Sequence, residues 1–168
     1  DIDGEAEWDQ SGRSVGLSAD GSTIAIGATS NDGNGYNSGH VHIYQNNNGS
    51  WDQIGGDIDG EASGDYSGGS VTLSADGSIV AIGAYLNDGN GDRSGHVRIY
   101  QNDNGSWAQV GDDIDGEAEL DFLGGSVSLS ADGSTIAMGA IYNDGNGDTS
   151  GHVRIYQNDN GSWAQVGD

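Results

Sequence analysis

The chain has 168 residues, and its 27 aspartates and glutamates against four basic residues give a formal net charge of −23. This balance argues against nucleic acid as a partner, because phosphate contacts require clustered Lys or Arg side chains. There is no cysteine to form a disulfide, and no apolar run reaches the roughly 18 residues of a membrane span, so membrane insertion is not expected. The first residue is Asp rather than Met, which indicates an excised or processed piece.

A repeat organises the whole sequence. The motif DIDGEA begins at Asp1, Asp57 and Asp113, a spacing of 56 residues, and three such units account for the full length. The second and third units differ at only eleven positions. We therefore expect three structural units, 1–56, 57–112 and 113–168, that fold in the same way.

Four strands are predicted in each unit, as the middle unit illustrates. Alternating apolar residues over 70–74 lead into an Asp-Gly hairpin turn, after which 79–84 forms the second strand. Segments 96–101 and 106–111 follow as the third and fourth strands, on either side of a short turn. Four antiparallel strands in a repeat of this length are typical of a β-propeller blade, although three repeats also suit a β-trefoil.

The strands of each unit resemble a known family. The stretch SGGSVTLSADGSIVAIGA, followed by SGHVRIYQ, is similar to the FG-GAP repeat of integrin alpha-subunit propellers, and all three units carry this pattern. The resemblance implies an all-β propeller with three blades per chain and an extracellular or cell-surface location. The family's calcium loop lies between its first two strands, where this chain has only SADGS, so the family's metal residues have no counterparts here.

The long acidic loops are predicted to share one end of the blades. In a four-stranded meander the first and third connections lie at one end, so the loops that contain DIDGEA and NDGNG lie together at the other. Sequence differences among the units concentrate in these loops, as expected if packing fixes the strands while loops serve recognition. The large aromatic residues of the variable loops are therefore candidate ligand contacts: Trp8, Tyr66, Tyr85, Phe122 and Tyr142.

The NDGNG loop is also a candidate calcium site, because acidic and amide side chains at alternate positions begin an EF-hand loop. The candidate ligands are Asp88, Asn90, Asp92, Asp144, Asn146 and Asp148. An ordinary acidic turn is the alternative, since Arg93 and Ile99 stand where the EF-hand has Gly and Glu, and Tyr36 replaces the third ligand in the first unit. The sequence requires no cofactor, and calcium is the ion that these loops could hold.

One histidine begins the third strand of each unit, at His40, His96 and His152. We expect these rings to pair with the acidic loops rather than to bind one metal ion together, because rotation about a propeller axis keeps equivalent residues apart. One tryptophan begins the fourth strand of each unit, where packing between blades is the expected role.

The polar clusters argue against catalysis, because all are triplicated and none has a nucleophile, a base and an orienting group of its own. We therefore predict that the chain is not an enzyme but a β-propeller scaffold or adhesion module, with a lectin-like carbohydrate-binding propeller as the alternative. Protein or glycan ligands are the expected partners.

Three blades cannot close a propeller ring, so the chain is also expected to bind copies of itself. A homodimer with six blades falls within the usual range of about four to eight, whereas a homotrimer would have nine. A monomeric β-trefoil is the remaining alternative.

Overall fold

Three antiparallel β-sheets make up the computed structural model, which describes residues 1–167. The first sheet contains β1 (Ser11–Leu17), β2 (Thr23–Ala28), β3 (His40–Asn47), β4 (Ser50–Gln53) and β5 (Ile58–Asp59). The second contains β6 (Ser70–Leu73), β7 (Ile79–Ala84), β8 (His96–Asp103), β9 (Ser106–Gln109) and β10 (Ile114–Asp115). The third contains β11 (Leu123–Leu129), β12 (Thr135–Ala140), β13 (His152–Asp159) and β14 (Ser162–Gln165). Among these residues no helix is long and apolar enough to cross a membrane.

The hairpin between β6 and β7 shows how the repeated sequence fixes local structure. The carboxylate of Asp76 accepts hydrogen bonds from Ser74 Oγ at 2.7 Å and from the Ser78 amide at 3.0 Å, while Gly77 adopts a φ of 72°. A side chain that satisfies the turn amide and a glycine at positive φ are what such a tight turn requires. The same turn recurs in the other units, and hydrogen bonds from Ser22 hold the pKa of Asp20 at about 2.

Each of the first two sheets receives an additional two-residue strand from the following unit. In the first sheet, β4 pairs with the second half of β3, and β5 pairs with its first half through His40 and Val41. In the second sheet β10 pairs with β8 in the same way. The DIDGEA motif is therefore partly strand, and hydrogen bonding crosses the predicted boundary between 56 and 57.

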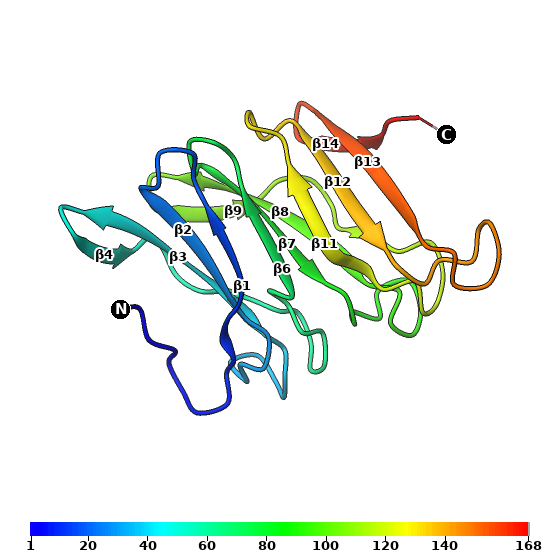
Figure 1. Cartoon of the computed structure of the whole chain (residues 1–168), viewed down its shortest axis with the longest axis horizontal. Helices are drawn as coiled ribbons and strands as arrows, with labels where there is room; N and C mark the ends of the chain where they lie inside the picture. The colour runs from blue at the N-terminus through cyan, green and yellow to red at the C-terminus, as the bar shows by residue number, and fades with distance from the viewer. Residues whose placement is uncertain (168) are drawn as a thin grey trace.

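The three sheets lie side by side like blades around an axis (Figure 1). The first strands are neighbours, β1 against β6 and β6 against β11, as the innermost strands of a propeller would be. The ladders of the named strands stay within their own sheets, so the arrangement is a row of blades and not a β-trefoil. The prediction of an all-β, three-bladed chain is confirmed, and closure of a ring stays a prediction.

The hydrophobic core lies between the sheets. One cluster joins the first two sheets, with Val41 and Ile43 of β3 packed near Val71 and Leu73 of β6. An equivalent cluster joins the second and third sheets, with Val97 and Ile99 of β8 in the corresponding positions. Burial of these branched side chains supplies the main driving force for stacking the blades.

Glycine permits the closest approach between the blades. A Cβ at Gly83 of β7 would collide with the carbonyl oxygen of Gly124 in the next sheet, and Gly27 stands in the same relation to Gly68. The repeated Gly-Ala pair that ends each second strand therefore has a packing reason in the first two units.

Candidate functional site

The acidic loops gather at one end of the three blades, as predicted (Figure 1). Hydrogen bonds join the loop of one unit to the DIDGEA segment of the next: Asn34 Nδ2 donates to Gly60 O at 2.8 Å, and Asn90 Nδ2 donates to Gly116 O at 2.8 Å. We call this end the acidic loop face; it comprises residues 1–10, 29–39, 60–69, 85–95, 116–122 and 141–151. Backbone acceptors thus fix the loop 29–39 to the segment 60–69, and the loop 85–95 to the segment 116–122.

A buried aspartate anchors the acidic loop face in every unit. Asp65 is almost fully buried; its carboxylate accepts from Asn87 Nδ2 at 3.0 Å and from the Ala62 amide at 3.0 Å. Asp9 and Asp121 make the equivalent contacts. Sequence reasoning missed these residues because buried carboxylates are uncommon. The available signal was an Asp kept at a spacing of 56 residues within otherwise variable loops.

The candidate calcium ligands have separate roles in the loop. Asp88 Oδ1 accepts the Arg93 amide at 2.7 Å, and Asn90 turns its amide toward the next unit. Asp92 is exposed, with one oxygen 3.9 Å from Arg93 Nε. In the third unit Asp144 likewise accepts a loop amide, and Asn146 and Asp148 are exposed. The Asp88 and Asp144 carboxylates thus close the loop on an amide five residues later, whereas the Asx turn belongs to the preceding Asn87, whose Oδ1 accepts the Gly89 amide at 2.7 Å. Calcium binding by the loop stays a prediction.

The aromatic candidates form separate pairs. The rings of Tyr66 and Tyr85 lie 6.2 Å apart, and those of Phe122 and Tyr142 lie 5.0 Å apart in an edge-to-face arrangement. Trp8 is 86% exposed.

A depression of about 750 Å³ lies on the acidic loop face, formed by the loops of the first unit and bordered by Tyr66 of the second. Trp8, Tyr36 and Tyr66 line it together with the buried Asp9 and Asn31. Asn37 Nδ2 donates to the Tyr66 hydroxyl at 2.8 Å, which fixes that ring against the loop. The depression therefore combines fixed polar groups with exposed aromatic faces.

Histidine and carboxylate groups meet between consecutive blades, as expected. His96 Nδ1 lies 3.7 Å from Glu61 Oε2 and 3.7 Å from Asp113 Oδ2. Burial, with the nearby Arg98 charge, lowers the pKa of His96 to about 4, and burial raises the pKa of Glu61. Arg98 Nη1 lies 3.4 Å from Glu61 Oε1, and Arg98 Nη2 donates to Asp59 O at 3.0 Å. A guanidinium thus offsets part of the negative charge of this cluster.

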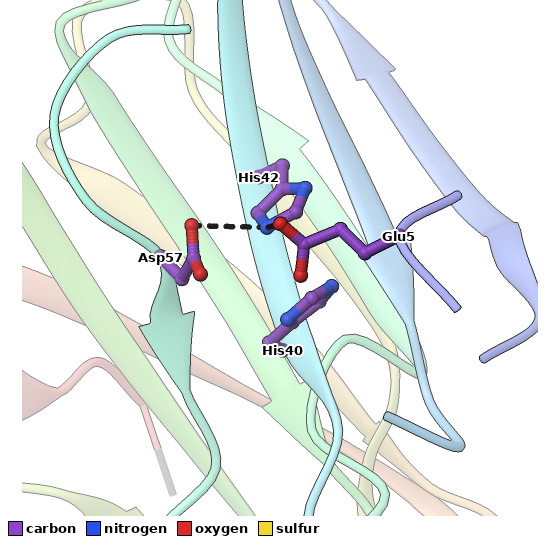
Figure 2. Close-up of side chains that lie close together, drawn as sticks. All are labelled: Glu5, His40, His42 and Asp57. Atoms are coloured by element: carbon purple, nitrogen blue, oxygen red, sulfur yellow. Dashed lines mark ion pairs between the residues drawn. The ribbon is translucent and has the colours of Figure 1, made fainter. Parts of the chain in front are cut away.

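The first unit has a different cluster, because His42 occupies the position of Arg98 (Figure 2). His42 Nε2 lies 3.0 Å from Asp57 Oδ1 and 3.7 Å from Glu5 Oε1. The His40 ring lies beside that of His42, with centroids 4.1 Å apart and planes tilted by 36°, and burial lowers the pKa of His40. Two imidazoles and two carboxylates can each offer one ligand atom, all within 4.8 Å of one another.

Comparison with known protein families identifies the repeat. The family model described as FG-GAP repeat matches residues 2–44 and 58–100, which together make up half of the chain. A comparison with curated protein sequences found no match.

Solved structures of similar fold are larger propeller proteins. A putative 6-phosphogluconolactonase from Bacteroides uniformis has a TM-score of 0.61 at 18% identity; the alignment covers 92% of this chain and 39% of that one. Sqt1 from Saccharomyces cerevisiae has a TM-score of 0.60 at 16% identity, with 96% and 36% covered. The periplasmic gluconolactonase PpgL of Pseudomonas aeruginosa has a TM-score of 0.56 at 19% identity, with 86% and 38% covered. At these identities the likeness concerns the fold alone, and the chain spans less than two fifths of each relative.

These structures correct the prediction that the chain is not an enzyme. Two of them are named as lactonases and share this architecture, so a row of propeller blades gives no ground for excluding catalysis. The physical reason is that a fold positions loops without deciding their chemistry, which depends on the particular side chains that the loops carry.

Proposed function

Because the chain belongs to the FG-GAP repeat family, we propose that it is a β-propeller interaction module whose ring is completed by further copies of the same chain. The observation that carries this proposal is the pair of open faces at the ends of the row. Val15 of β1 is 62% exposed, whereas its equivalent Val71 in the second sheet is 9% exposed. Val153 and Ile155 of β13 are likewise exposed, although their equivalents in β3 and β8 are buried.

The contact between neighbouring blades occurs twice within the chain, and each time it joins two different surfaces. The two open faces at the ends of the row are these same two surfaces, one at each end. Within the chain, the β3 face of one blade packs on the first strand of the next. The β13 face of one copy can therefore receive β1 of another copy through the same residues. Such a contact is heterologous, and it closes a ring when the rotation between blades permits. Exposed apolar faces of this kind mark interaction surfaces in soluble proteins.

Polar groups at the two ends support the same pairing. The Ser70 hydroxyl donates to Gly124 O in the next blade at 2.7 Å, and its third-unit equivalent Ser126 is exposed. The Trp107 indole donates to Ile54 O in the preceding blade at 2.9 Å. Its first-unit equivalent Trp51 has no acceptor among residues 1–167. A second copy would supply both missing partners.

The first residues of the chain fit the open edge of β13. In the first sheet, Ile58 and Asp59 pair with Val41 and His40 of β3. Their equivalents at the start of the chain are Ile2 and Asp3, which can pair with Val153 and His152 of another copy. The added strand would exchange backbone hydrogen bonds between the copies as β5 does between the units.

Light scattering coupled to gel filtration tests ring formation. A ring of two copies has a mass of two times 17.1 kDa, and a ring of three copies has three times that mass. Six blades lie within the usual range, so we expect the dimer. A species of 17.1 kDa that persists at high protein concentration would contradict the proposal.

Two single variants test the heterologous geometry. Val15→Glu and Val153→Glu each place a charge on one of the two open faces, so each variant alone should be monomeric and folded. Mixing them leaves one unaltered β13 face and one unaltered β1 face, which should restore association to a dimer. A mixture that stays monomeric, or a variant that still forms rings, would count against this interface.

The acidic loop face is the surface that such a ring would present to a ligand, and the family resemblance favours an extracellular or cell-surface setting. Carbohydrate binding is the second candidate function, and the depression lined by Trp8 and Tyr36 favours it. Exposed aromatic faces stack on sugar rings, while fixed polar groups orient the sugar hydroxyls. Screening against a glycan array tests it. Glycan binding that is lost in Trp8→Ala and kept in Tyr142→Ala would support this site. An array without any bound glycan would contradict carbohydrate binding.

A further inference from the structure

We propose that the first unit holds a divalent transition-metal ion of the zinc type, bound by Glu5, His40, His42 and Asp57. The site lies within a single chain, between the segment that precedes β1 and the connection from β4 to β5 (Figure 2). It is separate from the NDGNG loop and does not depend on ring formation.

The four side chains converge from three parts of the sequence. The two histidines project from the same face of β3, two residues apart, while Glu5 and Asp57 approach from opposite sides. Their possible ligand atoms lie within 4.8 Å of one another, a spacing that a single ion can bridge with small side-chain movements. Four protein ligands of nitrogen and oxygen type complete the tetrahedral set that zinc prefers.

A buried nitrogen without a hydrogen bond points into this cluster. The His42 side chain is only 6% exposed, and its Nε2 has no hydrogen-bond partner, although Asp57 Oδ1 lies 3.0 Å away. The other ring nitrogen, Nδ1, lies 3.3 Å from the Tyr44 hydroxyl. When Nδ1 carries the proton and donates to Tyr44, Nε2 presents its lone pair to the cluster. An outer hydrogen bond of this kind is the usual partner of a metal-bound imidazole.

The other two units show why the first unit recruits a cation. At the position of His42 they have Arg98 and Arg154, whose guanidinium groups lie 3.4 Å and 3.8 Å from a glutamate of the cluster. The first unit has the same carboxylates without that fixed charge. A bound divalent ion would supply the missing positive charge, and His42 would supply a second imidazole ligand that the other units lack.

The donor set selects the class of ion. Imidazole nitrogen favours zinc, copper, nickel and iron, whereas calcium and magnesium prefer oxygen ligands throughout. Zinc should therefore bind in preference to calcium, with a dissociation constant in the micromolar range or tighter and one ion per chain.

Isothermal titration of the full, tag-free chain with zinc, after chelator treatment, measures stoichiometry and affinity. Cobalt provides a second readout, because its visible absorption reports four-coordinate nitrogen and oxygen ligation. We expect one equivalent of zinc, retained in a large excess of calcium. Absence of zinc binding at millimolar concentration, or displacement of zinc by calcium at equal concentration, would overturn the proposal.

The repeat supplies two matched variants. His42→Arg copies the residue of the other units into the first unit and should abolish binding while preserving the melting temperature of the metal-free chain. Arg98→His creates the same four-residue set around Glu61, His96 and Asp113, and should raise the stoichiometry to two. Full binding in a folded His42→Arg chain would refute the assignment. If His42→Arg fails to fold, Glu5→Gln tests the same site, and wild-type affinity in that variant would also refute it.

Discussion

The second and third sheets contain the same third strand, HVRIYQND, in two different environments. Val97 of β8 is fully buried against the next sheet, whereas Val153 of β13 is 66% exposed because no sheet follows it in the chain. The residues and the strand length are alike, and each strand pairs with the strand before it and the strand after it, although only β8 also pairs with a two-residue strand of the following unit. The difference shows that burial in this protein depends on position in the row of blades and not on local sequence.

The folding of a single blade and the packing of blades against one another therefore depend on different contacts. A sheet can form with one face open, as the third sheet does, yet each hydrophobic cluster takes side chains from two sheets. Substitutions at equivalent positions should therefore affect unfolding strongly where a neighbour is present and weakly where it is absent.

The largest effect is expected for Ile99→Ala compared with Ile155→Ala. Ile99 is buried between the second and third sheets, so its truncation removes apolar contacts and leaves a cavity, at a cost of about 2–5 kcal/mol in the free energy of unfolding. Ile155 is exposed in the single chain, and its truncation should cost less than about 1 kcal/mol there. Urea unfolding of dilute chains measures both, and equal losses would contradict the comparison.

The next effect is a pH dependence of stability to which the buried His96 contributes. Burial and the Arg98 charge lower the pKa of His96 to about 4, against about 6.5 in the unfolded chain, while Glu61 and Asp113 face the ring. The unfolded state therefore binds more protons between these values.

The contribution of uncharged His96 to the free energy of unfolding is therefore fully present above pH 6.5. It declines as the pH falls toward 4, by at most about 1.4 kcal/mol per pH unit. His96→Gln should flatten this part of the profile. Chemical unfolding at a series of pH values measures the slopes; a His96→Gln chain with the wild-type slope would contradict the assignment.

A smaller effect is expected for Trp107→Phe compared with Trp51→Phe. The Trp107 indole donates across the blade interface to Ile54 O at 2.9 Å, and phenylalanine keeps most of the packing while removing the donor. The loss should be about 1 kcal/mol for Trp107 and near zero for Trp51 in the single chain. If both variants lose the same stability at low concentration, the interblade hydrogen bond does not explain the difference.

The smallest effect is expected for Ser70→Ala compared with Ser126→Ala. Ser70 donates to Gly124 O in the next blade at 2.7 Å, and Ser126 is exposed at the open end. We expect a loss of about 0.5 kcal/mol for Ser70→Ala and none for Ser126→Ala in dilute solution. Thermal unfolding of the wild-type chain and the two variants, measured side by side, tests this difference. A loss of stability in Ser126→Ala that grows with protein concentration would instead indicate that Ser126 contacts another copy in a ring.

The blade architecture could be predicted from the sequence because its causes are local and repeated. Alternating apolar residues and Asp-Gly turns placed β6, β7, β8 and β9 within two residues of their observed bounds. The shared position of the acidic loops followed from the meander itself. Tryptophan between blades was also predicted, as Trp107 and Trp163 confirm.

The remaining features depend on contacts between units that local patterns do not encode. The strands β5 and β10 have two residues each, too few for any periodicity, and pair with a strand of the preceding unit. The cluster of Glu5, His42 and Asp57 forms only when the chain folds back along β3, so spacing in the sequence gives no sign of it. The single informative signal was the substitution of His42 for an arginine present in both other units.

The strands β5 and β10 have a consequence for how such chains can change in length. The first and second sheets are each completed by two residues that belong to the following repeat. The boundary between two repeats, at DIDGEA, therefore does not coincide with the boundary between two sheets. Duplication or deletion of one 56-residue repeat would add or remove a blade while reproducing the same joint on both sides. The number of blades in a ring can therefore drift by whole repeats during evolution without the invention of a new interface, and the angle between adjacent blades decides which numbers survive.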